Sequence, residues 1–263
     1  MRIAICSDLH LEFGDINLQN TDNADVLILG GDICVAADIG RPDPHNFLEG
    51  ARSNRIADFF KRCSFQFPHV VYIMGNHEHY HGDFATSGNK IKSMLESNML
   101  SNVYLLDKEI KTIDDVTFVG GTLWTDMNKG DSLTMWHCGK AMNDFKVITN
   151  SNRMVQHKKN VYHESERNED GTLVVRTVDH YQSPSRWSAE DSVEDHKKML
   201  DYIKFVTENK TKQYVVVTHH APTPISIAEC YRFDTLMNGA FASDLSEFIL
   251  DRPQIKLWTH GHM

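Results

Sequence analysis

The chain has 263 residues, which is enough for one domain with a large core, or for one domain that carries an insertion. Its 36 Asp and Glu outnumber its 27 Lys and Arg, and the formal net charge of -9 excludes the overall basic surface of many nucleic-acid-binding proteins. No apolar run approaches the ~18 residues that span a bilayer, so we expect no membrane segment.

The cysteine pattern and the first residues predict the cellular compartment. The five cysteines show no C-x-x-C spacing and imply no disulfide framework, which suits the reducing cytosol. The sequence begins directly with an apolar strand pattern and not with a signal peptide. We therefore expect a cytoplasmic protein.

Taken in chain order, short apolar runs that end in polar or glycine-rich turns predict β-strands. These runs lie at residues 3–6, 26–29, 70–74, 103–106, 116–119, 214–217 and 255–258. Apolar residues at helical spacing predict helices at residues 52–62, 84–100, 188–208 and 241–250. Ser188 and Asp191 suit a capping box at the start of the third helix, and residues 37–50 are expected to form a loop. Alternating strands and helices predict βαβ units and an α/β fold.

Residues 127–184 are the least regular part of the chain. Asp170-Gly171, followed by the apolar Leu173-Val174-Val175, predicts a β-hairpin. Two interpretations of the segment remain open. It is either an insertion that covers a site and selects substrate, or a surface excursion without such a role.

Five of the predicted strands are followed directly by side chains that can bind a metal ion. These side chains are Asp8 and His10, Asp32, Asn76 and His77, His219 and His220, and His262. Ligands of open α/β sheets bind at the carboxyl ends of the strands, so we expect these residues to converge. Carboxylate, imidazole and amide oxygen form the mixed donor set that suits Mn, Fe, Zn or Ni better than a thiolate zinc site. Asp32, a lone carboxylate, could bridge two ions that clamp a phosphoryl group.

At this point the sequence resembles the calcineurin-like metallophosphoesterases, and most closely their small bacterial and phage members. The motifs in question are Asp8-Leu9-His10, Gly31-Asp32, Gly75-Asn76-His77-Glu78, His219 and Gly261-His262. The resemblance implies two facing mixed β-sheets flanked by helices, with the metals at one end. It also implies one metallophosphoesterase domain over residues 1–263, with a cap or insertion at about 127–184.

The family also implies roles for individual residues. Two divalent metal ions are expected, with Mn as the first expectation and Fe, Zn, Ni or Mg as alternatives. Asp8, His10 and Asp32 would hold the first ion, and Asp32, Asn76, His219 and His262 the second. A metal-bound hydroxide would attack phosphorus, and His77 would protonate the leaving oxygen. His220, Glu78 and His79 are candidate substrate contacts.

The sequence departs from the family pattern at two places. The last motif of the family is Gly-His-x-His, whereas this sequence ends Gly261-His262-Met263, so we expect a truncation within that motif. Many members carry Asp three residues after the bridging carboxylate to orient the catalytic His, and Val35 occupies that position here. Asp38, Glu12 or a backbone carbonyl could take its place.

The predicted function is a metal-dependent phosphoesterase that hydrolyses phosphomonoesters or phosphodiesters. The acidic balance favours a small phosphate ester as substrate over nucleic acid. One alternative is an interaction module on the same fold, with or without bound metal and with weakened catalysis. A further alternative is a nuclease, which predicts a basic groove near residues 127–184.

Overall fold

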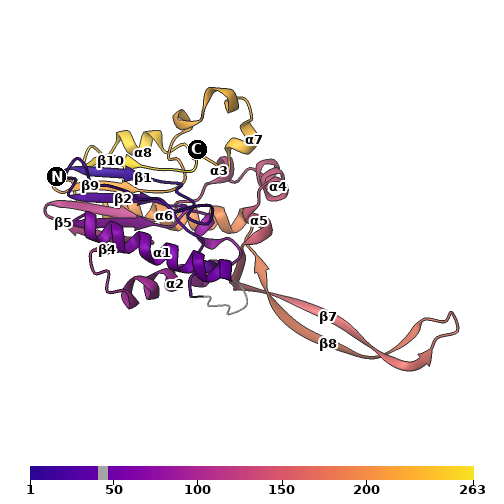
Figure 1. The fold of residues 1–263 in the computed structure, drawn as a ribbon. Coiled ribbons are helices and arrows are strands. Elements are labelled where there is room, and N and C mark those ends of the chain that lie inside the picture. The colour runs from indigo at the N-terminus through magenta and orange to yellow at the C-terminus, as the bar shows by residue number, and fades with distance from the viewer. Residues whose placement is uncertain (41–46) are drawn as a thin grey trace.

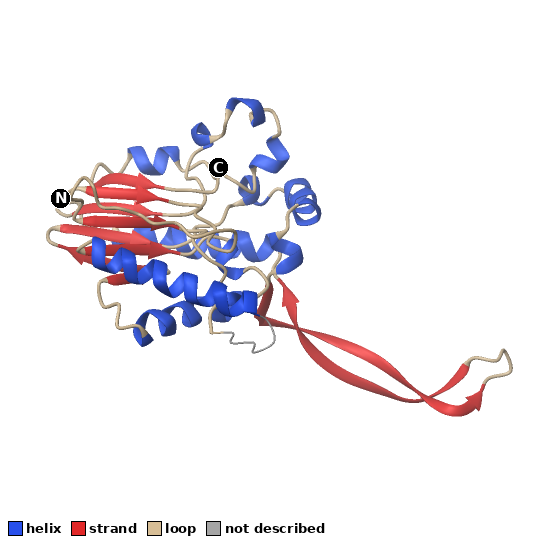
Figure 2. Cartoon of the chain, in the orientation of Figure 1, coloured by secondary structure: helices blue, strands red, loops and turns tan. Residues whose placement is uncertain are grey.

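The computed structural model describes residues 1–40 and 47–263 of the chain. Within these residues two four-stranded sheets face each other, helices cover their outer faces, and a two-stranded arm projects from the body (Figures 1 and 2). The N-terminal sheet has the strand order β1 (Ile3–Cys6), β2 (Val26–Gly30), β3 (His69–Ile73) and β4 (Val103–Leu106). The C-terminal sheet has the order β10 (Ile255–Thr259), β9 (Gln213–Val217), β6 (Val116–Gly120) and β5 (Glu109–Ile113).

The expected α/β fold with facing sheets is confirmed, but the two sheets differ in strand direction. All three pairings in the N-terminal sheet are parallel, so this sheet is not mixed. The C-terminal sheet is mixed, because β5 runs antiparallel to β6 while β6, β9 and β10 are parallel. Helical crossovers between β2, β3 and β4 explain the parallel order, since parallel neighbours cannot be joined by a tight turn.

The helices lie between and after these strands, and the longer ones cover the sheets. Their bounds are α1 (Phe47–Gln66), α2 (Phe84–Ser97), α3 (Met127–Gly130), α4 (Ser132–Ala141), α5 (Asp144–Val147), α6 (Ala189–Val206), α7 (Thr235–Asn238) and α8 (Ser246–Leu250). Short 3₁₀ helices occupy Ala36–Asp38, His77–His79, Pro224–Ser226 and Glu229–Tyr231. None of the described helices is long and apolar enough to cross a membrane.

The alternation of side chains along the strands builds the layers of the core. In β2, Val26 and Ile28 face the C-terminal sheet and join a cluster with Phe118 and Val215. The intervening side chains of β2 face the opposite way, toward α1 and α2, in a cluster that includes Leu27, Leu29, Phe59, Phe60, Tyr72 and Ile91. On the far side, α6 packs against the C-terminal sheet through Met199 and Ile203. The two sheets therefore share one apolar layer, and helices pack on the outer face of each.

Two local expectations needed correction. Residues 241–250 were expected to be helical throughout, but only Ser246–Leu250 form α8. Residues 241–243 instead bond with Ala221: Ala221 N donates to Phe241 O and Ser243 N donates to Ala221 O. The expected loop at 37–50 also ends earlier, because α1 begins at Phe47, while residues 41–46 lie outside the described part of the chain.

The hairpin predicted around Asp170-Gly171 is much longer than expected. Strands β7 (Thr149–Arg167) and β8 (Leu173–Arg186) pair antiparallel from Thr149–Arg186 at the root to Arg167–Leu173 near the tip. We call residues 149–186 the arm. It extends away from both sheets (Figure 1), while α3, α4 and α5 of the same segment stay on the body.

Candidate metal centre

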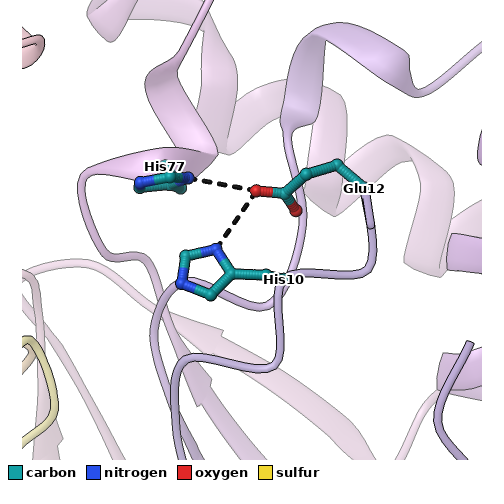
Figure 3. A group of neighbouring side chains, drawn as sticks. All are labelled: His10, Glu12 and His77. Atoms are coloured by element: carbon teal, nitrogen blue, oxygen red, sulfur yellow. Dashed lines mark hydrogen bonds and ion pairs between the residues drawn. The ribbon is translucent and has the colours of Figure 1, made fainter. Parts of the chain in front are cut away.

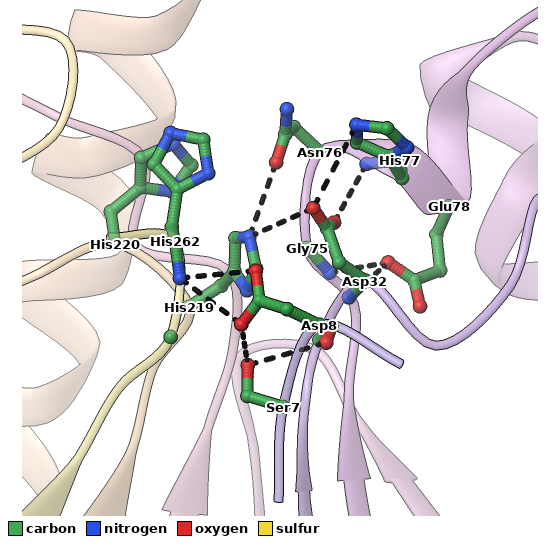
Figure 4. A network of polar contacts seen from close by, with 12 residues as sticks. Ser7, Asp8, Asp32, Gly75, Asn76, His77, Glu78, His219, His220 and His262 are labelled. Atoms are coloured by element: carbon green, nitrogen blue, oxygen red, sulfur yellow. Dashed lines mark hydrogen bonds and ion pairs between the residues drawn. The ribbon is translucent and has the colours of Figure 1, made fainter. Parts of the chain in front are cut away.

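The predicted metal-binding side chains meet at one edge of the two sheets. Asp8, Asp32 and Asn76 follow the carboxyl ends of β1, β2 and β3, and His219 and His262 follow β9 and β10. Backbone bonds hold the loops together, since Asp8 N donates to Gly31 O and Gly261 N donates to His219 O. Figure 4 shows the side chains of Asp8, Asp32, Asn76 and His219 pointing toward one another.

His219 lies at the centre of this convergence and is fully buried. Its Nδ1 is 2.8 Å from Gly30 O, so Nδ1 carries a proton and donates to that carbonyl. Its Nε2 then faces two acceptors, Asn76 Oδ1 at 3.1 Å and Asp32 Oδ2 at 3.3 Å. Three electron-rich atoms this close repel one another unless a second proton or a metal cation lies between them.

Asp144 determines which way the Asn76 amide points. Asp144 is 2% exposed, and its Oδ1 accepts a 2.7 Å hydrogen bond from Asn76 Nδ2. An ionised carboxylate only accepts, so the amide nitrogen faces Asp144 and the amide oxygen faces His219. The Tyr80 hydroxyl lies 3.5 Å from Asn76 Nδ2 and also interacts with Asp144. Asp144 begins α5, so the segment that was hardest to interpret supplies a contact at the centre.

Four of the converging residues have a backbone conformation that is uncommon for residues with side chains. Asp8, His10, Asp32 and His262 have φ angles of 56°, 49°, 53° and 58°. Such left-handed residues cost free energy, on the order of 1–3 kcal/mol where the conformation is strained, and they cluster at functional sites. Here the turn after each strand directs the side chain back across the sheet edge.

Two glycines let the loops approach closely. Gly31 has a φ of +89°, and a Cβ at this position would lie 2.6 Å from His219 Nδ1. A Cβ at Gly75 would collide with Asp32 Oδ1 and lie 2.7 Å from His219 Nε2. Both loops therefore require glycine for the carboxylate and imidazole to meet.

A second polar cluster lies beside the first and involves Glu12. Its Oε1 accepts from Nδ1 of both His10 and His77, each at 3.1 Å (Figure 3). With Nδ1 occupied, both rings turn Nε2 away from Glu12, and Nε2 of His77 lies 4.0 Å from Asp32 Oδ2. Of the three substitutes considered for the missing Asp at position 35, the structure selects Glu12.

The donor atoms fall into groups compact enough to hold cations. Ligand atoms of Asp8, His10 and Asp32 lie within 4.8 Å of one another, as do those of Asp32, His219 and His262. Asp32 belongs to both of these groups, whereas a third compact group, formed by His10, Glu12 and His77, does not include it. The buried His262 Nε2 has no hydrogen-bond partner among the described residues, which fits a nitrogen that binds a cation. The residues present therefore fit two divalent ions that share Asp32.

Comparison with known protein families gives a match that covers the whole chain. A family model described as "Calcineurin-like phosphoesterase" matches residues 1–263. The chain belongs to the calcineurin-like phosphoesterase family. Membership makes it a hydrolase of phosphoester bonds, and it agrees with the two donor groups, because the family typically uses a pair of divalent metals.

The individual proteins that this chain resembles have sequence identities to it of 29%, 14% and 12%. The uncharacterized protein L509 of Acanthamoeba polyphaga mimivirus is 29% identical over 277 residues, which cover 97% of this chain and 82% of L509. The crystal structure of phosphopantetheinyl hydrolase (PptH) from Mycobacterium tuberculosis has a TM-score of 0.55 at 14% identity, covering 99% of this chain and 82% of that one. The crystal structure of TT1561 from Thermus thermophilus has a TM-score of 0.47 at 12% identity, covering 98% and 80%. At 14% identity PptH supports the fold alone.

Burial and neighbouring charges shift the pKa values of three residues at this phosphoesterase centre. Burial alone would raise the pKa of Asp32, but the imidazoles of His219 and His77 hold it well below its usual range. Burial would lower the pKa of His219, and Asp32 outweighs it, raising that pKa to about 9. The pKa of His262 falls to about 3, because burial and the neighbouring His219 disfavour its charged form. Asp32 is thus ionised and His262 neutral at neutral pH, as metal ligands require.

The second cluster, formed by Glu12, His10 and His77, raises the pKa of His77. Burial would raise the pKa of Glu12, yet hydrogen bonds from His10 and His77 lower it to about 2. Burial would lower the pKa of His77, but the hydrogen bond to Glu12 and the charge of Asp32 raise it above its ordinary value. Glu12 therefore favours the imidazolium form of His77.

The structure does not support Glu78 as a substrate contact. Its side chain is fully buried and accepts hydrogen bonds from the backbone N–H groups of Asp32, Ile33 and Gly75. The Tyr72 hydroxyl donates a further bond of 2.7 Å. Glu78 therefore joins the loops after β2 and β3 through buried hydrogen bonds, and it positions Asp32 through the backbone N–H of that residue.

His79 and His220, also considered as substrate contacts, are buried as well. His79 is 1% exposed, and its ring packs 4.9 Å from Phe84. Burial lowers its pKa to about 4, so it is neutral. His220 is 2% exposed and stacks on Trp124 at 5.2 Å, with its ring 4.2 Å from that of His262. The two histidine rings thus pack among aromatic side chains and are almost completely shielded from solvent.

Sequence reasoning missed Asp144 and Tyr80. Asp144 lies in a segment with no strand pattern, and its partner Asn76 is 68 residues away in the chain. Tyr80 stacks on His77 at 4.0 Å, with 20° between the rings. Its position two residues after Glu78 was the only available signal. Both residues contact predicted ones, since Asp144 accepts a hydrogen bond from Asn76 and Tyr80 packs on the ring of His77.

Proposed function

We propose that this chain is a metal-dependent hydrolase of small phosphate esters that works with two divalent ions sharing Asp32. The observation that carries the proposal is the position of Asp32 between two groups of donors, Asp8 with His10 and His219 with His262. A carboxylate in this place can bridge two cations, as a two-metal phosphoesterase needs. The donor set of carboxylate, imidazole and amide suits Mn²⁺ as it suits Fe, Zn or Ni, and we propose Mn²⁺ as the ion to test first.

Bound divalent ions would lower the pKa of a coordinated water and offset charge on the phosphoryl oxygens. The side chains of the protein supply the remaining functions. Asp8, His10, Asn76, His219 and His262 hold and orient the donor atoms.

His77 is proposed to hold the proton that the leaving oxygen takes. Its Nδ1–H is bound to Glu12, so Nε2 is the atom free to carry a second proton toward the centre. The hydrogen bond to Glu12 and the charge of Asp32 raise the pKa of His77 and so favour this protonated form. The geometry favours acid catalysis, because the ring is held on one side by Glu12 and on its face by Tyr80.

A small ester, either monoester or diester, is the proposed substrate class. The net charge of -9 disfavours long-range attraction of a polyanion, so nucleic acid is the less favoured substrate. The site opens at the sheet edge, where His10 and His77 are partly exposed while Asp32 is buried. A phosphate group could therefore reach the imidazoles from solvent.

The test uses chelator-treated protein with p-nitrophenyl phosphate and bis(p-nitrophenyl) phosphate, with and without Mn²⁺. Mn²⁺ is expected to restore hydrolysis of at least one substrate, and the ratio of the two rates separates a monoesterase from a diesterase. The Asp32→Asn protein, which keeps the shape of the side chain and removes its charge, serves as the matched control. Equal hydrolysis by both proteins would contradict the proposal.

A further inference from the structure

The arm is the largest feature of the molecule that the proposed function does not use. Among the described strands, β7 and β8 pair only with each other, apart from the single bridge between Thr149 and Asp83 at the root. The backbone groups along the outer edges of both strands are therefore left without strand partners. Figure 1 shows the arm extending into open space.

The arm exposes apolar side chains on both strands. The exposed fractions are 47% for Met154, 42% for Val155, 47% for Tyr162, 45% for Val178 and 52% for Tyr181. An isolated two-stranded hairpin is marginally stable at best in water. An exposed strand edge with apolar side chains is also a ready surface for pairing with another chain. The arm therefore has the features of an interaction surface.

The charges along the arm indicate what it pairs with. Its inner half, residues 149–159 and 179–186, carries four Lys or Arg and one Asp, a net charge of +3. Its outer half, residues 160–178, carries two Arg and four acidic residues, a net charge of -2. Two arms side by side in opposite directions would bring opposite charges together, whereas parallel arms would bring like charges together. An anionic polymer would be repelled by the outer half.

The root of the arm has a hollow that suits the tip. This basic hollow, with a volume of about 430 Å³, is lined by Lys90, Lys146 and Arg186, together with Asp83 and His81. Asp83 is already engaged, because its Oδ1 accepts from Ala85 N at the start of α2 and from Ser151 N. The basic side chains are exposed, as are Glu169 and Asp170 at the tip.

We propose that two copies of this chain associate through their arms, which pair antiparallel about a two-fold axis. In this arrangement Glu169 and Asp170 of each tip lie against the basic hollow at the root of the other arm. Two-fold symmetry makes the contact occur twice, so a single substitution changes it twice per dimer. Because His81 and Gly82 of the hollow follow the His77–His79 turn, each tip would lie beside the catalytic loop of the second copy.

Sedimentation velocity of the full chain over a wide concentration range tests this proposal. The wild type is expected to form a dimer that dissociates on dilution and weakens as salt increases. Glu169→Lys and Lys90→Glu should each raise the dissociation constant about tenfold, because each places like charges together twice per dimer. The double variant, in which both charges are exchanged, should return close to wild-type association.

The matched control is Glu208→Lys, which makes the same charge change at an exposed position outside the arm and should not affect association. A further variant with residues 154–183 replaced by a short glycine-rich linker should be monomeric. If that variant fails to fold, the three full-length charge variants decide the question.

Four results would overturn the proposal. The first is a wild-type protein that is monomeric at every concentration, whether or not its arm binds nucleic acid. The second is a dimer that survives removal of the arm. The third is association that neither Glu169→Lys nor Lys90→Glu changes. The fourth is a double variant that associates no better than either single variant. None of these substitutions touches the metal centre, so a failure here leaves the proposed hydrolase function standing.

Discussion

The metal centre and the arm use polar residues in opposite ways. At the centre, Asp32, His219 and Asn76 are at most 3% exposed, and the side chains of all three take part in short polar contacts with one another or with Gly30 and Asp144. Along the arm, side chains on both faces contact solvent, and most of the described charged side chains are exposed. A buried polar cluster is stable only when every member is satisfied, so the acceptors that face His219 Nε2 at the centre need either a proton on that nitrogen or a cation between them. The arm carries no such constraint within one chain.

Asp32→Ala gives the largest expected difference between the two regions. Removal of the shared carboxylate should abolish binding of both ions, and the rate should fall by more than the ~10–100-fold that loss of an outer ligand partner costs. Metal content by mass spectrometry and phosphate-ester hydrolysis measure the effect. Asp179→Ala, the same change in the arm, should leave both unchanged. Normal metal content in the Asp32 variant would remove Asp32 from the bridging role.

His77→Ala should leave both ions in place and slow the reaction by about 10²–10⁴-fold, since the group that protonates the leaving oxygen is lost. The loss should be smallest for p-nitrophenyl esters, whose leaving group needs little protonation, and largest for alkyl phosphates. Rates on a series of leaving groups measure this dependence. A variant as fast as the parent on alkyl esters would exclude His77 as the acid.

Asp144→Asn tests whether the segment before the arm supports the centre. Without the carboxylate, the Asn76 amide is free to turn its nitrogen toward the ions, and we expect metal affinity to fall about 10–100-fold. Calorimetric titration with Mn²⁺ measures the affinity directly. Asp115→Asn, in an exposed turn between β5 and β6, is the control. Equal affinities for the two variants would make the Asp144 contact structural only.

The pH dependence of ion binding follows from His219. Without metal its pKa is raised to about 9, mainly because Asp32 opposes the effect of burial, so the apoprotein holds a proton there at neutral pH. A metal ion must displace this proton, so affinity should increase as pH rises toward 9 and level off above it. Titration in buffers of different ionisation enthalpy should show proton release on binding. Affinity independent of pH between 7 and 9 would contradict this assignment.

The smallest effect is expected from shortening the arm. Replacement of residues 154–183 by a glycine-rich linker removes none of the residues at the centre, so Mn²⁺ affinity and the rate per site should stay within about twofold of the wild type. Loss of metal binding in a folded, shortened protein would show that the arm belongs to the site. That result would remove the distinction between the two regions.

The strands and the residues at their ends could be predicted because both depend on local sequence. Val26 to Leu29 form a buried run that can only be a central strand or a buried helix, and Gly30-Gly31 ends it. The capping box at Ser188 and Asp191 was likewise present as predicted, with both reciprocal bonds formed. The residues that orient the centre were harder to find, because Glu12 and Asp144 lie 65 and 68 residues from the side chains they hold.

Other differences have equally physical causes. Residues 241–245 have the composition of a helix, but bonds to Ala221 hold 241–243 in an extended path. Glu78 has the type and position of a substrate contact, yet three backbone N–H groups and a tyrosine hydroxyl occupy it. The hydrogen bonds to Ala221 join residues that are distant in the sequence, and the burial of Glu78 depends on the fold, so neither could be predicted from local sequence. The length of the arm could not be foreseen because neither face of its strands is consistently apolar.

The central claim is that Asp32 lies between two metal ions. Anomalous X-ray scattering from Mn²⁺-loaded crystals tests it most directly. The account predicts two peaks per chain, both adjacent to Asp32 and separated by ~3.5–4 Å, one near Asp8 and His10 and one near His219 and His262. A single peak, or a peak held by His10, Glu12 and His77, which also form a compact donor group, would contradict it.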